Sequence, residues 1–190
     1  MTLTTKHGKS KSAGKRRPGK PRGVLSSTGG AAALAAGPLS YPAELQKESN
    51  WCWAAVGSCT DRFYQGTKEQ CDVACIQYPS CDCCQDGDPC NNPSQLDEVL
   101  GALGRMQNWD EGYAAKNDLS SELTGGRVVA ARIGWNGGGG HFIALVGYES
   151  QSDIVSVEDP ASGSHQMPFD ELRDNYLGKG SWTHTYWTKR

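Results

Sequence analysis

Residues 46–55 read Gln-Lys-Glu-Ser-Asn-Trp-Cys-Trp-Ala-Ala, a stretch that predicts a helix beginning beside a cysteine, Cys52. Apolar side chains then recur at steps of three and four, at Trp53, Val56, Cys59 and Phe63. This periodicity predicts a helix over residues 51–65, with Asn50 or Ser49 as its N-cap. Cys52 would then lie in the first turn, where the helix dipole favours a thiolate, the nucleophilic form of the side chain.

A histidine far downstream is a candidate partner for this thiol. His141 opens an apolar run at 142–148, and a second run at 154–157 follows after a short polar segment, which together predict a β-hairpin. If position 148 pairs near 154, position 143 faces 159. Because positions 141 and 143 share one face of the strand, Asp159 can reach the imidazole diagonally, whereas Glu158 points to the opposite face. An acid at position 159 would orient the ring and stabilise its protonated form.

Gln46 lies six residues before the thiol, where its amide and the main-chain N–H of Cys52 could form an oxyanion hole. Three features together resemble those of a papain-like cysteine peptidase. They are Gln46 ahead of Cys52-Trp-Ala, His141-Phe at the start of a strand, and Asp159-Pro at the end of the next strand. The nearest match is the compact bacterial branch that includes the AvrRpt2-type effectors, with a looser likeness to C39-type leader peptidases. The likeness covers about residues 41–190.

The resemblance implies that Cys52 is the nucleophile, His141 the base and acid, Asp159 the orienting residue and Gln46 the oxyanion donor. It implies hydrolysis of peptide bonds in a protein or peptide through an acyl-enzyme intermediate, with no cofactor and no metal. Larger plant-type members usually have Asn where this chain has Asp159. We expect a monomer.

Two other functions remain open on the sequence. The same thiol chemistry would serve a deamidase or acyltransferase acting as a toxin or effector. The second alternative is a non-enzymatic binding module cross-linked by disulfides, because a lone cysteine before Trp-Ala-Ala is more often a small core residue than a nucleophile.

Helical patterns come first along the chain and strand patterns afterwards, which predicts an α+β fold with a papain-like arrangement. Further helices are expected at 68–77, at 117–124 and at 169–176. Another is expected to begin after Ser94, its N-cap, and to carry a stripe of apolar residues. Strands are expected at 128–133, 142–148, 154–157 and 182–187. The helical half would carry the nucleophile and pack on a C-terminal antiparallel sheet half, leaving a cleft for an extended peptide. The candidate cleft residues are Trp53, Trp135, Gly140 and Trp182, although Trp135 and Trp182 suit the core equally well.

The N-terminal segment differs sharply in charge from the rest of the chain. The first 22 residues carry eight Lys or Arg residues and no acid, which leaves 11 basic and 21 acidic residues and a net charge of −10 afterwards. We expect residues 1–40 to be a disordered basic tail that serves as an export signal, a pro-segment or a linker. No aromatic residues interleave the basic ones, which argues against nucleic-acid binding, and no apolar run is long enough to span a membrane. Self-cleavage near Gly30 or the run at 33–36 is a further expectation.

Eight cysteines favour an oxidising compartment. Cys59 lies two helical turns from Cys52, too far for a disulfide within that helix. The other six are candidates for disulfides whose pairing the sequence leaves open: Cys71, Cys75, Cys81, Cys83, Cys84 and Cys90. A zinc site and free thiols are the alternatives. The expected location is secreted or extracytoplasmic; a cytoplasmic protein or an injected effector is the alternative.

Overall fold

The computed structural model describes residues 37–190. The basic segment, the candidate export signal and the candidate cleavage sites near Gly30 and at 33–36 lie outside the described residues. Near the start of the described residues, the N–H of Leu39 donates to Val146 O at 2.7 Å. None of the helices in residues 37–190 has the length and apolar character that a membrane span requires.

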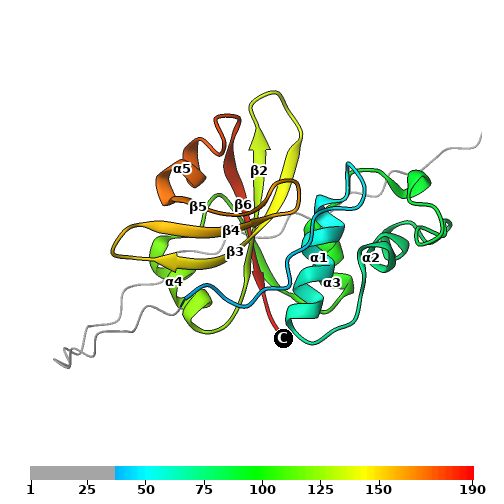
Figure 1. Cartoon of the computed structure of the whole chain (residues 1–190), viewed down its shortest axis with the longest axis horizontal. Coiled ribbons are helices and arrows are strands. Elements are labelled where there is room, and N and C mark those ends of the chain that lie inside the picture. Colours follow the sequence, from blue (N-terminus) through cyan, green and yellow to red (C-terminus); the bar gives the residue numbers. More distant parts are fainter. Residues whose placement is uncertain (1–36) are drawn as a thin grey trace, which may run out of the picture. The chain divides into compact units, whose positions relative to one another are not determined.

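The predicted α+β fold is confirmed, with helices first along the chain and an antiparallel sheet afterwards (Figure 1). The first helices lie on one side of the sheet: α1 (Cys52–Phe63), α2 (Gln70–Gln77), the short 3-10 helix η1 (Asp88–Cys90) and α3 (Leu96–Ala102). Two more helices, α4 (Lys116–Thr124) and α5 (Phe169–Asp174), lie on the other side.

Six strands form one sheet in the order β1-β6-β2-β3-β4-β5, and every neighbouring pair is antiparallel. The strands are β1 (Met106–Glu111), β2 (Val129–Trp135), β3 (Gly140–Glu149), β4 (Ile154–Asp159), β5 (Gly163–Pro168) and β6 (Gly180–Thr188). The central strands β2 and β3 read as nearly continuous apolar runs because both faces of the sheet are covered.

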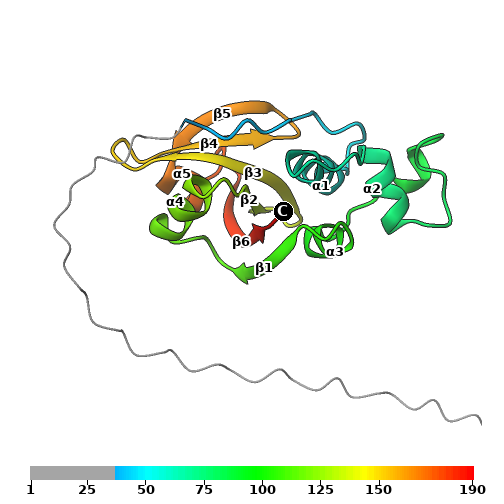
Figure 2. The same cartoon turned by 90° about the horizontal axis from the view of Figure 1, so that it is seen from below.

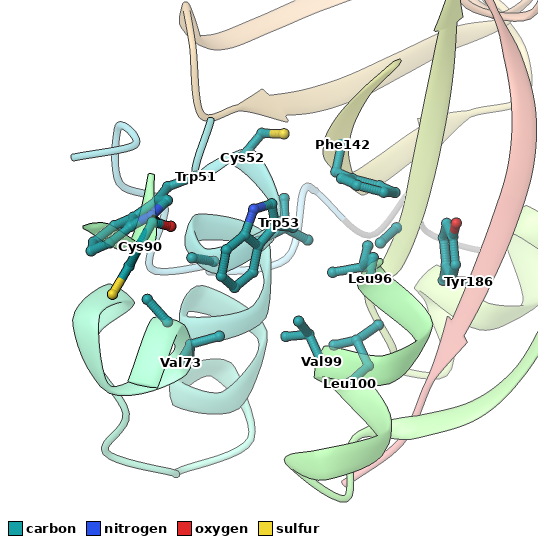
Figure 3. Packing of buried hydrophobic residues seen from close by; sticks show 14 of the residues in the cluster. Trp51, Cys52, Trp53, Val73, Cys90, Leu96, Val99, Leu100, Phe142 and Tyr186 are labelled. Atoms are coloured by element: carbon teal, nitrogen blue, oxygen red, sulfur yellow. Dashed lines mark hydrogen bonds between the residues drawn. The ribbon is translucent and has the colours of Figure 1, made fainter. Parts of the chain in front are cut away.

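Two core clusters lie on the opposite faces of this sheet. One joins α1, α2 and α3 to Ala130, Phe142 and Tyr186 of the sheet (Figure 3). The other packs α4 and α5 against the alternate residues of the same strands, including Ile143 and Leu145. Small residues let α1 sit deep in the first cluster: a side chain at Gly57 would lie 2.5 Å from a Val99 methyl group.

The segment before α1 runs alongside the β4–β5 edge of the sheet before it reaches the helical half (Figure 2). The N–H of Gln46 donates to Pro160 O at 2.8 Å, directly after the end of β4. This bond places Gln46 beside the end of the strand that carries Asp159. The segment therefore connects the two halves of the fold at the candidate site.

Several predicted details differ from the structure. The N-cap of α1 is Trp51, with no side-chain capping bond, in place of Asn50 or Ser49. Helix α3 likewise begins after Gln95 and not after Ser94, whose hydroxyl donates to Gln77 Oε1. The strands β1 and β5 were not predicted. Both are edge strands made largely of polar residues, so they lack the apolar pattern that identifies the inner strands.

Candidate active site

The Cys52 side chain lies at the N-terminus of α1 and is 9 % exposed. In Figure 3 its sulfur lies at the edge of the core cluster, away from Val73 and Val99. The chain enters the helix through a turn closed by the bond from Trp51 N–H to Glu48 O at 3.1 Å. Within residues 37–190 the main-chain N–H of Cys52 has no acceptor, so a hydrogen-bond donor is available beside the sulfur.

A strip formed by residues 90–92 holds this entry segment in place. Three residues donate to it: the N–H of Asn50 to Asn91 Oδ1 at 2.9 Å, the indole N–H of Trp51 to Cys90 O at 2.9 Å, and that of Trp53 to Asn92 O at 3.0 Å. The Asn50 side chain also donates to Asn91 O at 2.9 Å. The position of Cys52 therefore depends on residues some 40 positions further along the chain.

The cysteine-rich loop contains two disulfides, Cys71–Cys84 and Cys83–Cys90, which confirms the prediction of disulfides there. Cys75 and Cys81, also candidates, are free thiols in the structure, as are Cys52 and Cys59. In the described part of the chain, the group of potential metal ligands found is Cys71, Asp72 and Cys84. Because its two cysteines are joined to each other, they offer no thiolates for the alternative zinc site.

We expect the double substitution Cys83→Ser/Cys90→Ser to lower kcat about tenfold, because it frees the strip that holds Asn50, Trp51 and Trp53. Loss of the cross-link itself should lower the free energy of unfolding by about 2 to 3 kcal/mol. Cys71→Ser/Cys84→Ser is the matched control, since that disulfide costs similar stability to remove, but its cysteines accept no bond from Asn50, Trp51 or Trp53, whereas Cys90 accepts one from Trp51. Peptidase assays and urea unfolding measure both effects, and equal losses of kcat in the two variants would contradict the assigned role.

His141 and Asp159 form a buried ion pair at the end of the β3–β4 hairpin. The distance from His141 Nε2 to Asp159 Oδ1 is 2.6 Å. The hairpin register brings them together, since Ala144 pairs with Glu158 and Leu145 with Val157. Because the carboxylate accepts the hydrogen at Nε2, the other ring nitrogen is left for Cys52, which lines the same cleft and is among the groups that raise the pKa of the imidazole.

The charges of this pair reinforce each other. Burial alone lowers the pKa of His141, but the hydrogen bond that its ring donates to Asp159, the proximity of Cys52 and the negative charge of Asp159 outweigh it and raise the pKa to about 9. Burial likewise raises the pKa of Asp159, yet the hydrogen bond and charge of His141 hold that pKa far below its usual range. The arrangement thus favours an imidazolium beside the Asp159 carboxylate and in the same cleft as Cys52, which is the charge state of histidine that promotes an activated cysteine.

Gln46 lines the same cleft as Cys52, but its amide is already engaged. Its Nε2 donates to Glu48 O at 2.8 Å and to Ser49 O at 2.7 Å, which uses both amide hydrogens. Its Oε1 is buried without a partner among the described residues. In this structure Gln46 holds the turn before α1 and does not present a free donor to the cleft.

A cleft of about 380 Å³ contains both Cys52 and His141. Of the four predicted cleft residues, Trp53, Trp135 and Gly140 line it. Trp182 does not, which corrects that expectation: it is 4 % exposed, packs on Phe169 in the core and donates its indole N–H to His184 O. The cleft floor therefore comes from both halves of the fold, with the thiol on one side and the imidazole on the other.

The model of the Peptidase_C39 like family matches residues 38–186, which is most of the chain. The chain belongs to this family. The protein is accordingly a papain-like cysteine peptidase, and the predicted resemblance is confirmed. A search of curated proteins gave no match to this C39-like peptidase.

Two solved structures are similar to this C39-like peptidase. One is a double glycine motif protease from an AMS/PCAT transporter in complex with the leader peptide, 18% identical, with 81% of this chain and 95% of that chain covered and a TM-score of 0.49. The other is the Pseudomonas avirulence protein AvrPphB, 12% identical, with 74% and 92% covered and a TM-score of 0.40.

Three groups around the His141–Asp159 pair of the C39-like peptidase were not anticipated from the sequence. The buried Tyr176 hydroxyl donates to Asp159 Oδ2 at 2.7 Å, and the N–H of Ala161 donates to Asp159 Oδ1 at 2.7 Å. The Trp135 ring stacks on His141 with centroids 5.7 Å apart and planes 17° from parallel. Trp135 was a cleft candidate, but nothing in the sequence indicated the stacking. Tyr176 follows α5 and meets Asp159 only through tertiary packing, which no local motif signals.

We expect Tyr176→Phe to reduce kcat/KM roughly three- to thirtyfold, because Asp159 loses one of the donors that orient it and lower its pKa. The acid limb of the pH–activity profile should move to higher pH. Tyr148→Phe is the matched control, since Tyr148 donates to an aspartate, Asp153, at the same 2.7 Å but in the turn between β3 and β4. An unchanged pH profile in Tyr176→Phe would show that its bond to Asp159 has no catalytic consequence.

Proposed function

We propose that this peptidase cleaves peptide bonds through a Cys52-His141-Asp159 triad and an acyl-enzyme intermediate. The observation that carries the proposal is the position of His141, which is hydrogen-bonded to Asp159 at 2.6 Å and lines the same cleft as Cys52. The family supports peptidase chemistry in general, and this geometry supports these three residues as the ones that perform it.

The Cys52 thiolate attacks the scissile carbonyl carbon, and a C–S bond forms as the C=O electrons move to oxygen. Collapse of this tetrahedral species breaks the C–N bond, and His141 gives its proton to the departing amine. His141 then takes a proton from water, whose oxygen attacks the thioester and releases the acid and the free thiolate. Asp159 stays ionised throughout and orients the ring.

The main-chain N–H of Cys52 is the first donor that we assign to the oxyanion, because it has no acceptor within the described chain. Gln46 supports this donor by fixing the carbonyls of Glu48 and Ser49 in the turn that precedes it. Donation by Gln46 itself to the oxyanion requires one of these two bonds to open on substrate binding.

A mixed peptide library incubated with the protein in heavy-oxygen water tests the proposal. Hydrolysis cuts peptides and places one heavy oxygen in each new carboxyl group, and Cys52→Ala must not do so. Intact peptides in which an amide has become an acid would show a deamidase instead, and peptides joined to an added amine would show an acyltransferase.

We also propose that the protein works in an oxidising compartment, which the two disulfides of the cysteine-rich loop support. Mass spectrometry of the protein isolated from its native cell, alkylated before and after reduction, tests this. Eight alkylated cysteines before reduction would reject it.

A further inference from the structure

A second hollow, of about 720 Å³, adjoins the catalytic cleft on the far side of His141. Its walls are the turn between β2 and β3 and the loop between α5 and β6, which lie at the same edge of the sheet in Figure 1. The two walls are tied together, since the N–H of Asn136 donates to Lys179 O at 2.8 Å. The side chains that matter below are Trp135, Ala161, Leu177 and Lys179.

The position of this hollow assigns it to one side of the scissile bond. His141, Trp135 and Ala161 line both hollows, whereas Cys52 lines only the catalytic cleft. The acyl part of the substrate becomes bonded to Cys52 and must lie in the hollow that contains the thiol. The departing amine receives its proton from His141, so the hollow that reaches His141 without Cys52 lies on the leaving side.

The wall of this hollow presents an apolar side chain that the fold does not bury. Leu177 is 47% exposed and has a backbone φ of 50°, in the left-handed region that leucine rarely adopts. The next residue, Gly178, is also left-handed, with a φ of 72°. These two residues form a tight turn that Lys179 N–H closes on Tyr176 O at 3.0 Å, and the turn holds the apolar Leu177 side chain at the wall of a hollow beside His141, where a bound substrate would cover it.

The charge of the wall adds a second element of selectivity. Lys179 lines the hollow and forms no ion pair with any residue of the described chain. The one carboxylate in the lining, Asp159, is already paired with His141. A lysine or arginine side chain in the same hollow would therefore meet the like charge of Lys179 as well as lose water against Leu177 and Trp135. Apolar side chains meet neither penalty.

We propose that this hollow binds the part of the substrate that follows the scissile bond and selects an apolar side chain there, with Leu177 as the specificity-determining residue. The inference rests on the proposed peptidase function and adds the substrate class. Trp135 would cover the bound side chain from the β2–β3 turn, and Lys179 would exclude basic residues.

The experiment first reads the residues on both sides of each cut in a mixed peptide library by mass spectrometry. The best-cleaved peptide is then remade with Leu, Ser or Lys at the selected position after the cut, and also with an aminocoumarin in place of everything after the cut. We expect kcat/KM to fall about tenfold or more from Leu to Ser, and further for Lys.

Leu177→Asn is the main variant, because asparagine tolerates the left-handed backbone and removes only the apolar contact. It should lower kcat/KM for the Leu peptide about tenfold, mainly through KM, and leave the Ser peptide, which makes no apolar contact with residue 177, nearly unchanged. Ile76→Ser is the matched control, an exposed aliphatic residue on α2 outside both hollows. Leu177→Gly repeats the test should the asparagine variant misfold.

Three outcomes overturn the inference. Equal cleavage of the Leu, Ser and Lys peptides would show that the hollow is not selective. Faster cleavage of the Lys peptide would show that it selects basic and not apolar side chains. An unchanged KM in the folded Leu177 variants would reject that residue as its source. In each case continued cleavage leaves the peptidase function intact. Absence of any cleavage dependent on Cys52, with the aminocoumarin substrate included, would reject the proposed function and the inference together.

Discussion

Replacing Cys52 by alanine is expected to lower kcat on the order of 10⁴-fold or more, with no change in the far-ultraviolet circular dichroism. The sulfur forms the covalent bond of the proposed mechanism, so no other group can substitute for it. The fold should tolerate the change, because the side chain lies at the edge of the core cluster and the helix gains a residue of higher helix propensity. Single-turnover cleavage of a peptide substrate measures the loss.

Cys59→Ala is the matched control for this experiment. Cys59 is a free and buried thiol on the same helix, but burial raises its pKa and it does not line the catalytic cleft. Iodoacetamide at neutral or mildly acid pH should therefore modify Cys52 in the native protein and leave Cys59 unmodified. Turnover that survives in Cys52→Ala, or is lost equally in Cys59→Ala, would reject Cys52 as the nucleophile.

Replacing Asp159 by alanine is expected to lower kcat/KM about 10²- to 10⁴-fold, because His141 loses both its orienting acceptor and the charge that keeps it protonated. Asp159→Asn separates the two effects. Its amide oxygen can still accept the N–H at Nε2, so the loss should be smaller than in the alanine variant. Glu158→Gln is the control on the opposite face of β4. Equal activity in wild type and Asp159→Ala would exclude Asp159 from the mechanism.

The pH profiles of the same variants test the charge of the pair. The pKa of His141 is raised from 6.5 to about 9, so activity that requires the imidazolium should fall as the pH rises through about 9. Asp159→Asn removes the negative charge and should move this alkaline limb to lower pH. An alkaline limb that stays in place would show that Asp159 does not set the pKa of His141.

The pair also contributes to stability, and the sign follows from the two pKa directions. The raised pKa of His141 gives stability that is complete below 6.5 and is lost as the pH rises through about 9. The lowered pKa of Asp159 gives stability that is present above 3.8 and is lost as the pH falls further. The difference in Tm between wild type and Asp159→Ala should therefore be largest between about pH 4 and pH 6.5.

The sequence predicts most of the parts that depend on local patterns. The apolar steps from Trp53 identify α1, and two apolar runs around a short polar turn identify the β3–β4 hairpin. The predicted pairing of that hairpin holds near its His141 end, where Ala144 faces Glu158. An irregularity between Leu145 and Gly147 shifts the pairing by one residue toward the turn, with no effect on the reach of Asp159.

What the sequence does not predict depends on contacts between distant segments. Tyr176 reaches Asp159 only because the loop after α5 folds back over the end of β4. Cys83 and Cys84 are adjacent in the sequence, yet Cys83 pairs with Cys90 and Cys84 with Cys71, a choice that spacing alone does not determine. The engagement of the Gln46 amide by two carbonyls likewise needs the three-dimensional turn.

Because of the disulfide between Cys83 and Cys90, the redox conditions of expression and purification affect the specific activity of the protein as much as the assay buffer does. Dithiothreitol keeps the nucleophile reduced but also attacks this cross-link, slowly, since both of its cysteines are buried. Protein expressed in a reducing cytosol would never form it. Two batches of identical sequence can thus differ in specific activity, and brief, mild reduction of oxidatively folded material should give the most active enzyme.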